Sequence, residues 1–474
     1  MRLHTYATIC AHTKKPKIHP TIRRSNAHYY PPPPVESPNS TQFPPQSLKT
    51  RLKLLSSPNF RLRYIYRNID KSRQAFLSIN YKATIRKQPL CAIYLLPLLI
   101  LRKALCTLEY YSQPLTQSKI LAYQLPKPPK LSGFICLPAL LLQKLARIGL
   151  MPLSSFMHAR IFARFLLGRV DMPYFELVLT TRCTLRCESC NNLMQYFDSS
   201  NSYTCTLEGI AKTLEALLAK IDSIYNVRII GGEPLLFKDI DKVVKILDSS
   251  KKVKSFDIVT NATILPKPAL LDALQASAKC FVSISDYTKS PNLDIKLHIH
   301  KLQEILQARK IPHHILWQET KSAWFSPGKI YKRGRDRQGI VENFLACQMP
   351  CVSIMSHETI GRSLPTKLES SPKSFMATTQ NKTKADPFSK VSSTQSSVGE
   401  IFICPIASSL SRLNGLEEFS GDFISLDSTC DKYTILNFYA KEFFKACDYC
   451  HDMAAPKKPI PIAVQTSTTL KLTP

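Results

Sequence analysis

Between about residue 172 and residue 317, short apolar stretches alternate with longer amphipathic ones, and this alternation limits the folds open to the chain. The strand-like stretches are 175–180, 227–230, 256–260, 281–285 and 313–317, and the helix-like stretches between them are 207–220, 239–248, 268–277 and 298–309. Such alternation is typical of a parallel sheet whose strands are joined by crossover helices. We therefore predict an α/β fold, a partial or complete barrel with its chemistry at the carboxyl ends of the strands.

Three cysteines follow directly after the first predicted strand. The segment CTLRCESC places Cys183, Cys187 and Cys190 on one short loop with Cys-x3-Cys-x2-Cys spacing. Three thiolates can hold three irons of a cubane 4Fe–4S cluster and leave the fourth iron open to a ligand. A zinc site or a chance group of cysteines is the alternative. Structural zinc takes four closed ligands, however, and the next thiol, Cys205, stands alone.

A second short motif follows the next predicted strand. Gly231, Gly232, Glu233 and Pro234 form the sequence GGEP. Glycines allow the backbone to approach a ligand closely, and a carboxylate can bind an ammonium group. Alone, GGEP reads as an ordinary turn, but its place one strand after the cysteine loop favours a binding role.

The cysteine loop and GGEP, in this order at the ends of the first two strands, resemble the radical S-adenosylmethionine (SAM) superfamily. The resemblance implies a partial (β/α)6 TIM-like barrel and a 4Fe–4S cluster held by Cys183, Cys187 and Cys190. SAM would chelate the open iron, GGEP would bind the methionyl amine, and cleavage would give a 5′-deoxyadenosyl radical that abstracts hydrogen from a substrate. A reducing electron donor of the flavodoxin or ferredoxin type is also implied. One position departs from the pattern, because the often aromatic residue before the third cysteine is Ser189.

Polar residues at the ends of the third and fourth predicted strands are weaker candidates. Asn261 in TNAT, and Ser283 and Ser285 in SISDY, are expected to contact the cofactor, because parallel strand ends meet at one edge. Each of them fits a helix cap or a turn equally well. Asp286 and Tyr287 are candidates for contact with the substrate.

Further cysteines follow the predicted barrel. CQMPC contains Cys347 and Cys351, GEIFIC ends at Cys404, and CDYC contains Cys447 and Cys450. The Gly-x4-Cys unit before Cys404, followed by Cys-x2-Cys, resembles the auxiliary-cluster extensions called SPASM and twitch domains. This resemblance implies a second 4Fe–4S cluster held by Cys351, Cys404, Cys447 and Cys450, with Cys347 as the rival of Cys351. A zinc ribbon is the alternative for the same pairs.

The remaining cysteines carry no motif. Cys205, Cys280 and Cys430 are expected to be buried or incidental thiols, and no role is assigned to Cys10, Cys91, Cys106 and Cys136. The chain is long, its 15 cysteines are an odd number, and many stand at metal-ligand spacings. A reducing, cytoplasmic location therefore fits better than a disulfide framework.

The net charge of +30 is concentrated near the N-terminus, where residues 1–130 carry 22 Lys and Arg but three acidic residues. Because this charge lies outside the motif region, we do not expect a nucleic-acid partner. A solvated segment explains the charge, and adhesion of this segment to a membrane surface is a less favoured explanation. The longest apolar run, 90–101, contains Pro97 and falls short of the roughly 20 residues that a spanning helix needs.

These observations divide the chain into five predicted segments. They are a basic, Pro/Ser-rich, poorly ordered segment (1–130), an amphipathic helical lead-in (131–171), the radical SAM barrel (172–345), an auxiliary-cluster region (346–453) with an inserted mobile loop (357–398), and an unstructured tail (454–474).

The motifs define the initiating chemistry and leave the substrate open. We favour a peptide or protein substrate, with a sugar, another small metabolite or RNA as alternatives. A hypothesis from a different class is a non-catalytic iron–sulfur or zinc protein. The intact GGEP argues against it, because an electron carrier has no need of a methionine-binding turn.

Overall fold

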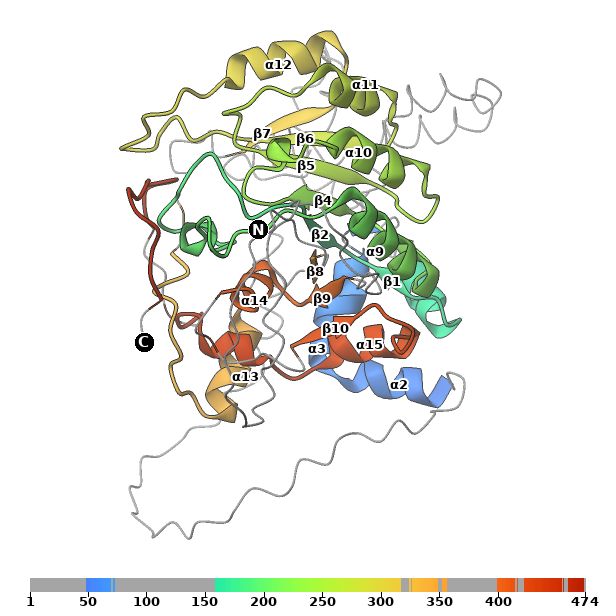
Figure 1. Cartoon of the computed structure of the whole chain (residues 1–474). Helices are drawn as coiled ribbons and strands as arrows, with labels where there is room; N and C mark the ends of the chain where they lie inside the picture. Colours follow the sequence, from blue (N-terminus) through green and yellow to red (C-terminus); the bar gives the residue numbers. More distant parts are fainter. Residues whose placement is uncertain are drawn as a thin grey trace, which may run out of the picture.

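The computed structural model describes residues 48–69, 71–72, 158–316, 324, 326–347, 352–355, 399–413, 416, 422–453, 455 and 459–472. Several predictions therefore lie outside the described residues, among them those on the loop 357–398, on most of the lead-in and on Cys351. The central feature of the described part is a single eight-stranded sheet with helices around it (Figure 1).

Five parallel strands in chain order form the centre of this sheet. They are β2 (Phe175–Val178), β4 (Val227–Ile230), β5 (Phe256–Thr260), β6 (Cys280–Ser285) and β7 (His313–Leu316). Between them run α9 (Leu207–Lys220), α10 (Ile240–Ser249), α11 (Pro268–Ala276) and α12 (Ile299–Ala308), which Figure 1 shows stacked along one side of the sheet. The predicted α/β class is confirmed, and the predicted element ends agree within two residues.

Each crossover helix has one apolar stripe, and α9 also has a capped start. In α9 the Thr206 hydroxyl accepts a hydrogen bond from the Gly209 N–H, and Ile210, Leu214 and Leu217 are buried at positions three and four apart. Buried stripes of this kind place the helices against the sheet. Nowhere in the described part of the chain does a helix combine the length and apolar character needed to cross a membrane.

The sheet continues past β2 on the side away from β4. There β8 (Val352–Met355) pairs in parallel with β2, and β9 (Glu400–Phe402) and β10 (Phe423–Ser425) follow antiparallel. The same region contains α13 (Arg337–Ala346), α14 (Pro405–Leu410), α15 (Lys432–Ala440) and the short helix η5 (Lys445–Asp448). The C-terminal cysteine region is therefore continuous with the sheet that carries the cysteine loop.

The prediction that residues 1–130 are poorly ordered is wrong for residues 48–69. These form α2 (Leu48–Ser56), α3 (Pro58–Phe60) and its continuation η1 (Arg61–Tyr66), drawn in blue beside α15 in Figure 1. Phe60, Tyr64 and Ile65 are buried, and the Phe60 and Tyr64 rings stack with centroids 4.8 Å apart. Apolar residues four apart make this helical face, and the surrounding Pro and basic residues obscure the pattern.

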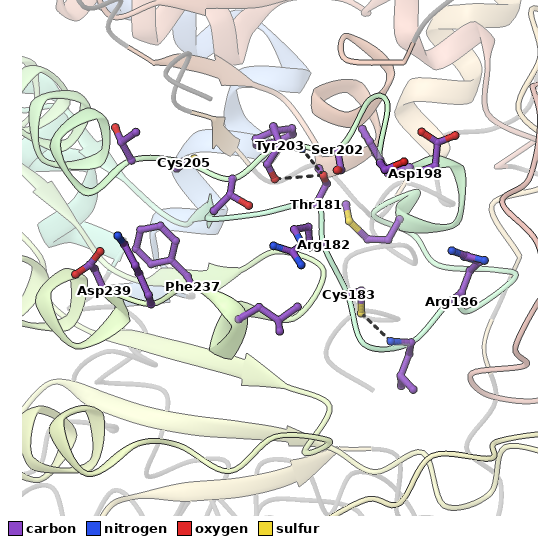
Figure 2. Close-up of a pocket in the computed structure, with 18 of the residues that line it drawn as sticks. Thr181, Arg182, Cys183, Arg186, Asp198, Ser202, Tyr203, Cys205, Phe237 and Asp239 are labelled. Carbon is purple, nitrogen blue, oxygen red and sulfur yellow. Dashed lines mark hydrogen bonds between the residues drawn. The ribbon is translucent and has the colours of Figure 1, made fainter. Parts of the chain in front are cut away.

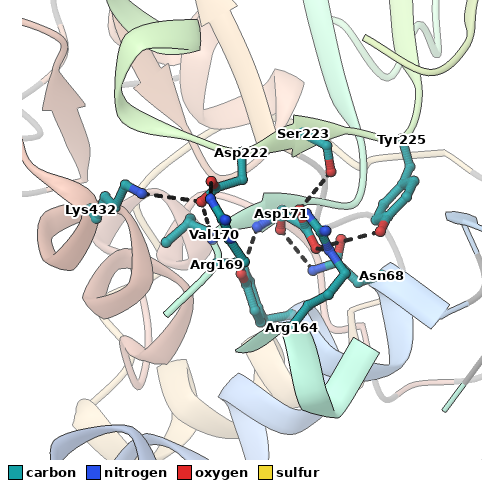
Figure 3. Close-up of polar contacts among 10 residues, drawn as sticks. Asn68, Arg164, Arg169, Val170, Asp171, Asp222, Ser223, Tyr225 and Lys432 are labelled. Atoms are coloured by element: carbon teal, nitrogen blue, oxygen red, sulfur yellow. Dashed lines mark hydrogen bonds and ion pairs between the residues drawn. The ribbon is translucent and has the colours of Figure 1, made fainter. Parts of the chain in front are cut away.

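Asp171 ties this N-terminal segment to the strands (Figure 3). Two hydrogen bonds of 2.6 Å from Arg164 and one of 2.6 Å from Ser223 reach its carboxylate. Its backbone N–H donates to the Tyr64 hydroxyl over 2.9 Å, and its carbonyl accepts from Asn68 over 2.8 Å. Asp171 lies just outside β2, in the two-residue strand β1 (Asp171–Met172). The blue helices are thereby an integral part of the folded domain.

The prediction of an unstructured tail is also wrong where the tail is described. Ile462 and Ala463 are buried, and the backbone near Gln465 pairs with the backbone at Cys187. The apolar segment IPIAV makes this possible, because it supplies small and medium side chains that fit against Leu185 and Cys187. The tail therefore lies on the cysteine loop.

Replacing the buried Tyr64 tests whether segment 48–69 stabilises the domain. Tyr64→Ala removes the ring that stacks on Phe60 and the hydroxyl bound to Asp171, so we expect the free energy of unfolding to fall by roughly 3–5 kcal/mol. Leu52→Ala, on the exposed side of α2, is the matched control and should change it by less than about 0.5 kcal/mol. Equal stability of the two variants in urea unfolding would contradict the packing described.

Candidate active site

The cysteine loop leaves β2 and returns to α9 as a closed structure. Its two limbs are joined where the Thr181 N–H donates to the Tyr203 carbonyl over 3.0 Å and the Cys205 N–H donates to the Leu179 carbonyl over 2.9 Å. At the far end, the Cys190 N–H donates to the Cys187 carbonyl over 3.2 Å. The three predicted cluster ligands therefore stand on one closed loop at the carboxyl end of β2, with Cys187 and Cys190 on one turn at its far end.

The three thiols lie in a poorly solvated environment. Loss of water contact raises the pKa of Cys187 to about 12 and raises the pKa values of Cys183 and Cys190 above the ordinary thiol value. The carboxylate of Glu233 adds to the rise at Cys183. Thiols of this kind keep their protons at neutral pH unless a metal centre displaces the protons and binds the thiolates. The loop therefore suits a ligand that brings positive charge.

The two glycines of GGEP are required by contact with the cysteine loop. The Gly232 N–H donates to the Thr180 carbonyl over 2.7 Å, and the Glu233 N–H donates to the Arg182 carbonyl over 2.9 Å. A Cβ atom at Gly231 would lie 2.5 Å from the Thr180 oxygen, and one at Gly232 would lie 2.2 Å from the Arg182 oxygen. The close approach that the sequence predicted toward a ligand is thus, in the structure, an approach toward the loop backbone.

Glu233 is completely buried and joins two strand ends. Its carboxylate accepts from the Thr260 hydroxyl over 2.9 Å, from the Asn261 N–H over 2.9 Å and from the Leu235 N–H over 3.1 Å. Burial raises the pKa of Glu233 to about 7, although these donors favour the charged form. A carboxylate has about four acceptor positions, so one remains for a further donor such as an ammonium group. Pro234 directly follows and begins a short helical turn.

Asn261 is placed beside the first cysteine. Its side-chain amide lies 3.8 Å from the Cys183 sulfur and 3.1 Å from the Thr184 hydroxyl, and its carbonyl oxygen accepts from the Thr263 N–H over 3.0 Å. The structure therefore brings Asn261, Glu233 and the cysteine loop together, as expected from strand ends that share one edge.

Ser283 and Ser285 are tied to neighbouring side chains. Ser283 donates to Asp257 over 3.0 Å, and Asp257 is also bound by Arg228 over 2.9 Å. Ser285 is hydrogen-bonded to Tyr287, whose ring meets Trp324 edge-on at 5.5 Å beside the cysteine loop. Their contact with the cofactor remains a prediction.

Ser283 belongs to a polar group on the sheet whose other members were not singled out from the sequence. Arg228, Asp257 and Ser283 lie on β4, β5 and β6, and His314 on β7 pairs with Ser283 in the strand register. Asp257 is completely buried, and among the described residues its Oδ1 atom finds no hydrogen-bond partner. Burial lowers the pKa of His314 to about 4. The sequence could have indicated this group, because its members are polar residues inside predicted strands that are otherwise largely apolar.

A pocket of about 800 Å³ opens beside the cysteine loop (Figure 2). Cys183 lines it together with the basic side chains of Arg182, Arg186 and Lys238 and the acidic side chains of Asp198 and Asp239. Of the residues predicted to bind the cluster or SAM, Cys183 alone lines this pocket, whose other lining residues belong to segment 181–207 and to segment 236–239 just after GGEP.

Four of the C-terminal cysteines line one small apolar pocket. Cys347 follows α13, Cys404 caps α14, and Cys447 and Cys450 belong to the turn at η5. Burial raises the pKa of both Cys404 and Cys447. The structure thus groups Cys347 with the three other predicted ligands, whereas Cys351 lies outside the described residues.

Arg63 brings a buried positive charge to this second cysteine group. Its side chain is 6% exposed, donates to the Phe344 carbonyl over 2.7 Å and lies 3.6 Å above the Phe344 ring. Burial lowers the pKa of Arg63 to about 10, whereas the Cys347, Cys447 and Cys404 thiols raise it. Among the described residues, no carboxylate forms an ion pair with it. A buried cation needs negative charge nearby, and thiolates would supply it.

Neither cysteine group is arranged as the ligand shell of a single ion. In the described ranges, no three or more His, Cys, Asp and Glu side chains converge closely enough to hold one metal ion. No disulfide joins any of the ten described cysteines. The fit to a cluster therefore rests on cysteine spacing, desolvation and the order of the motifs along the sheet.

The comparison with protein families defines the class. Residues 177–308 match the model of the Radical SAM superfamily, a range that runs from β2 to the end of α12 and includes the cysteine loop and GGEP. This part of the chain is a radical SAM domain. Domains of this superfamily use a 4Fe–4S cluster and SAM, so the predicted superfamily and these two cofactors are confirmed, whereas the SPASM or twitch region and its second cluster stay predictions.

Curated relatives give a more particular similarity. The chain is 33% identical over 100 residues to the GTP 3′,8-cyclase of Clostridium acetobutylicum, covering 21% of this chain and 30% of the relative. It is 35% identical over 118 residues to the enzyme of the same name from Listeria monocytogenes, covering 25% and 34%. The chain thus spans about a third of the length of the curated relatives it matches.

Solved structures show weaker similarity. The structure of anSMEcpe with bound AdoMet and a Cp18Cys peptide has 17% sequence identity and a TM-score of 0.24, covering 31% of this chain and 42% of that one. SuiB of Streptococcus suis bound to S-adenosylmethionine has 18% identity and a TM-score of 0.27, covering 37% and 43%. With TM-scores this low, the domain assignment rests on the family model.

Adding one methyl group at Gly232 tests the contact between GGEP and the cysteine loop. Because its Cβ would lie 2.2 Å from the Arg182 oxygen and 2.8 Å from the Cys183 Cβ, Gly232→Ala should displace the loop. We expect most of the iron bound by the first cysteine group to be lost and the free energy of unfolding to fall by roughly 1–3 kcal/mol. Gly339→Ala, inside α13, is the control and should keep the iron. Full iron loading in Gly232→Ala would contradict the geometry.

Proposed function

We propose that the chain is a radical SAM enzyme whose first cluster is held by Cys183, Cys187 and Cys190. When bound, the cluster and SAM supply reductive cleavage to a 5′-deoxyadenosyl radical, which abstracts hydrogen from a substrate. The observation that carries this proposal is the placement of the three desolvated thiols, Glu233 and Asn261 at one edge of the sheet within a radical SAM domain. A flavodoxin or ferredoxin type of protein would deliver the electron.

The residues around the thiols have separate roles in this proposal. Glu233 keeps one acceptor position for the methionyl amine, and its other bonds hold it rigidly against β5. Gly231 and Gly232 allow the turn to touch the loop, so that Glu233 and Cys183 stay at a fixed separation. Asn261 donates toward Cys183 and orients Thr184. Ser283 and Ser285 remain candidates for contact with SAM.

The second cysteine group is proposed to hold an auxiliary 4Fe–4S cluster of the SPASM or twitch type. We now favour Cys347 over Cys351 as its first ligand, because Cys347 lines the same pocket as Cys404, Cys447 and Cys450. Four thiolates occupy all four iron corners, which suits a cluster that exchanges electrons more than one that binds a substrate. The buried Arg63 guanidinium would offset part of its negative charge.

Two substrate classes remain in competition. A peptide or protein is the class favoured by the resemblance to enzymes with auxiliary clusters. A purine nucleotide is the second candidate, because curated relatives that are 30–35% identical over part of the chain are named GTP 3′,8-cyclase. Transfer of deuterium from labelled GTP or from labelled peptides into 5′-deoxyadenosine would distinguish them.

The proposed activity is tested by assaying 5′-deoxyadenosine after anaerobic iron–sulfur reconstitution and reduction with dithionite. The parent chain should form it from SAM, and replacement of Cys183, Cys187 and Cys190 by alanine should reduce the rate at least about 100-fold, because no cluster can deliver the electron. Cys205→Ala, which removes a buried thiol from the same loop, is the matched control and should remain active. A fully loaded parent that forms none would favour the non-catalytic alternative.

The ligands of the auxiliary cluster can be identified in a chain that lacks the first three thiols. This background should bind about four irons after reconstitution, all at the second site. Adding Cys347→Ser should remove most of this iron, whereas adding Cys351→Ser should leave it unchanged. The reverse result would restore Cys351 as the ligand, and binding of zinc in place of iron would support the zinc ribbon.

A further inference from the structure

The C-terminal segment 462–467 runs across the cysteine loop and is bound to its backbone. The Glu188 N–H donates to the Val464 carbonyl over 2.7 Å, and the Thr466 N–H donates to the Arg186 carbonyl over 2.9 Å. These bonds flank Cys187, which is 8% exposed. Cys187, the second of the three proposed ligands of the first cluster, is therefore covered by a segment that lies almost 280 residues further along the chain.

The Gln465 side chain reaches the sulfur of Cys187. Its Oε1 accepts from the Arg186 N–H over 2.8 Å, and its Nε2 donates to the Cys187 Sγ over 3.3 Å and to the Ala463 carbonyl over 2.6 Å. A backbone N–H is always a donor, so the bond to Arg186 fixes which end of the amide carries oxygen. The end that faces the sulfur is consequently the NH2 group.

The segment is also anchored on its other side. The Asn292 side chain donates to the Gln465 carbonyl over 2.9 Å and accepts from the Gln465 N–H over 2.8 Å. Ser290 donates to the Ala463 carbonyl over 2.8 Å. Gln465 is thus held between the cysteine loop and the loop that follows β6, and its amide has little freedom to turn away from Cys187.

We propose that Gln465 sets the reduction potential of the cluster held by Cys187 and that segment 462–467 shields this cluster from water. A hydrogen bond to a ligand sulfur favours the more negatively charged reduced state, and the reduction potential therefore rises. Gln465 is a positioning and tuning residue, since it acts through Cys187. The inference rests on the proposed function, because it needs the first cluster to be present.

The test is a redox titration of the reconstituted full-length chain followed by electron paramagnetic resonance (EPR). The first cluster is recognised by a change of its EPR signal when SAM is added. Gln465→Glu keeps an oxygen for Arg186 but turns a carboxylate toward the sulfur, and Gln465→Leu removes all three side-chain bonds, to Arg186, Cys187 and Ala463. Both variants should titrate at a more negative potential than the parent. Thr466→Ala is the control and should not shift, because that hydroxyl bonds the Thr468 carbonyl at the surface.

The outcomes separate this inference from the proposed function. If the parent cluster responds to SAM and the Gln465 variants titrate together with Thr466→Ala, the tuning role is overturned and the proposed function stands. If the parent forms no cluster that responds to SAM, the proposed function fails and the inference falls with it.

A second measurement covers variants that bind iron poorly. In the metal-free chain, the rate at which N-ethylmaleimide alkylates Cys187 can be followed by peptide mass spectrometry, with buried Cys205 as the internal reference. Gln465→Leu should raise the Cys187 rate several-fold relative to Cys205, and Thr466→Ala should not. Unchanged rates in Gln465→Leu would contradict the covering of Cys187 by the C-terminal segment.

Discussion

The contact between the GGEP turn and the cysteine loop is the constraint on which the site depends. Two backbone hydrogen bonds, at 2.7 and 2.9 Å, join them, and there is no space for a Cβ atom at either glycine. This contact fixes the loop at the carboxyl end of β2. The bonds from Glu233 to β5 and the position of Asn261 beside Cys183 then follow from the parallel order of the strands.

Both cysteine groups are completed by segments from the ends of the chain. Arg63 comes from the helices at 48–69 and places a buried cation against the C-terminal cysteines. Gln465 comes from the tail and donates to Cys187. Arg63 acts on the thiols through its charge and Gln465 through a hydrogen bond, both in a poorly solvated place where such interactions are stronger than in water. The N-terminal helices and the tail therefore shape the electrostatics of the two proposed clusters.

The strands, the crossover helices and the first cysteine group could be predicted because their patterns are local. Apolar periodicity defined α9 and β5, and Cys183, Cys187 and Cys190 were singled out by their spacing and by their place after the first strand, ahead of GGEP. The contacts of Arg63 and Gln465 could not be predicted, because they join residues 281 and 278 positions apart with no local pattern. The helical face of Phe60 and Tyr64 was hidden for another reason: the surrounding composition is typical of disorder.

The central claim is that SAM binds the cluster of the Cys183 loop through its methionyl amine. The most direct test is electron–nuclear double resonance on the reduced full-length chain with SAM labelled by ¹⁵N at that amine. The account requires a ¹⁵N coupling to the cluster that disappears in the variant without Cys183, Cys187 and Cys190. A reduced, EPR-active first cluster that shows no ¹⁵N coupling in the presence of excess SAM would contradict it.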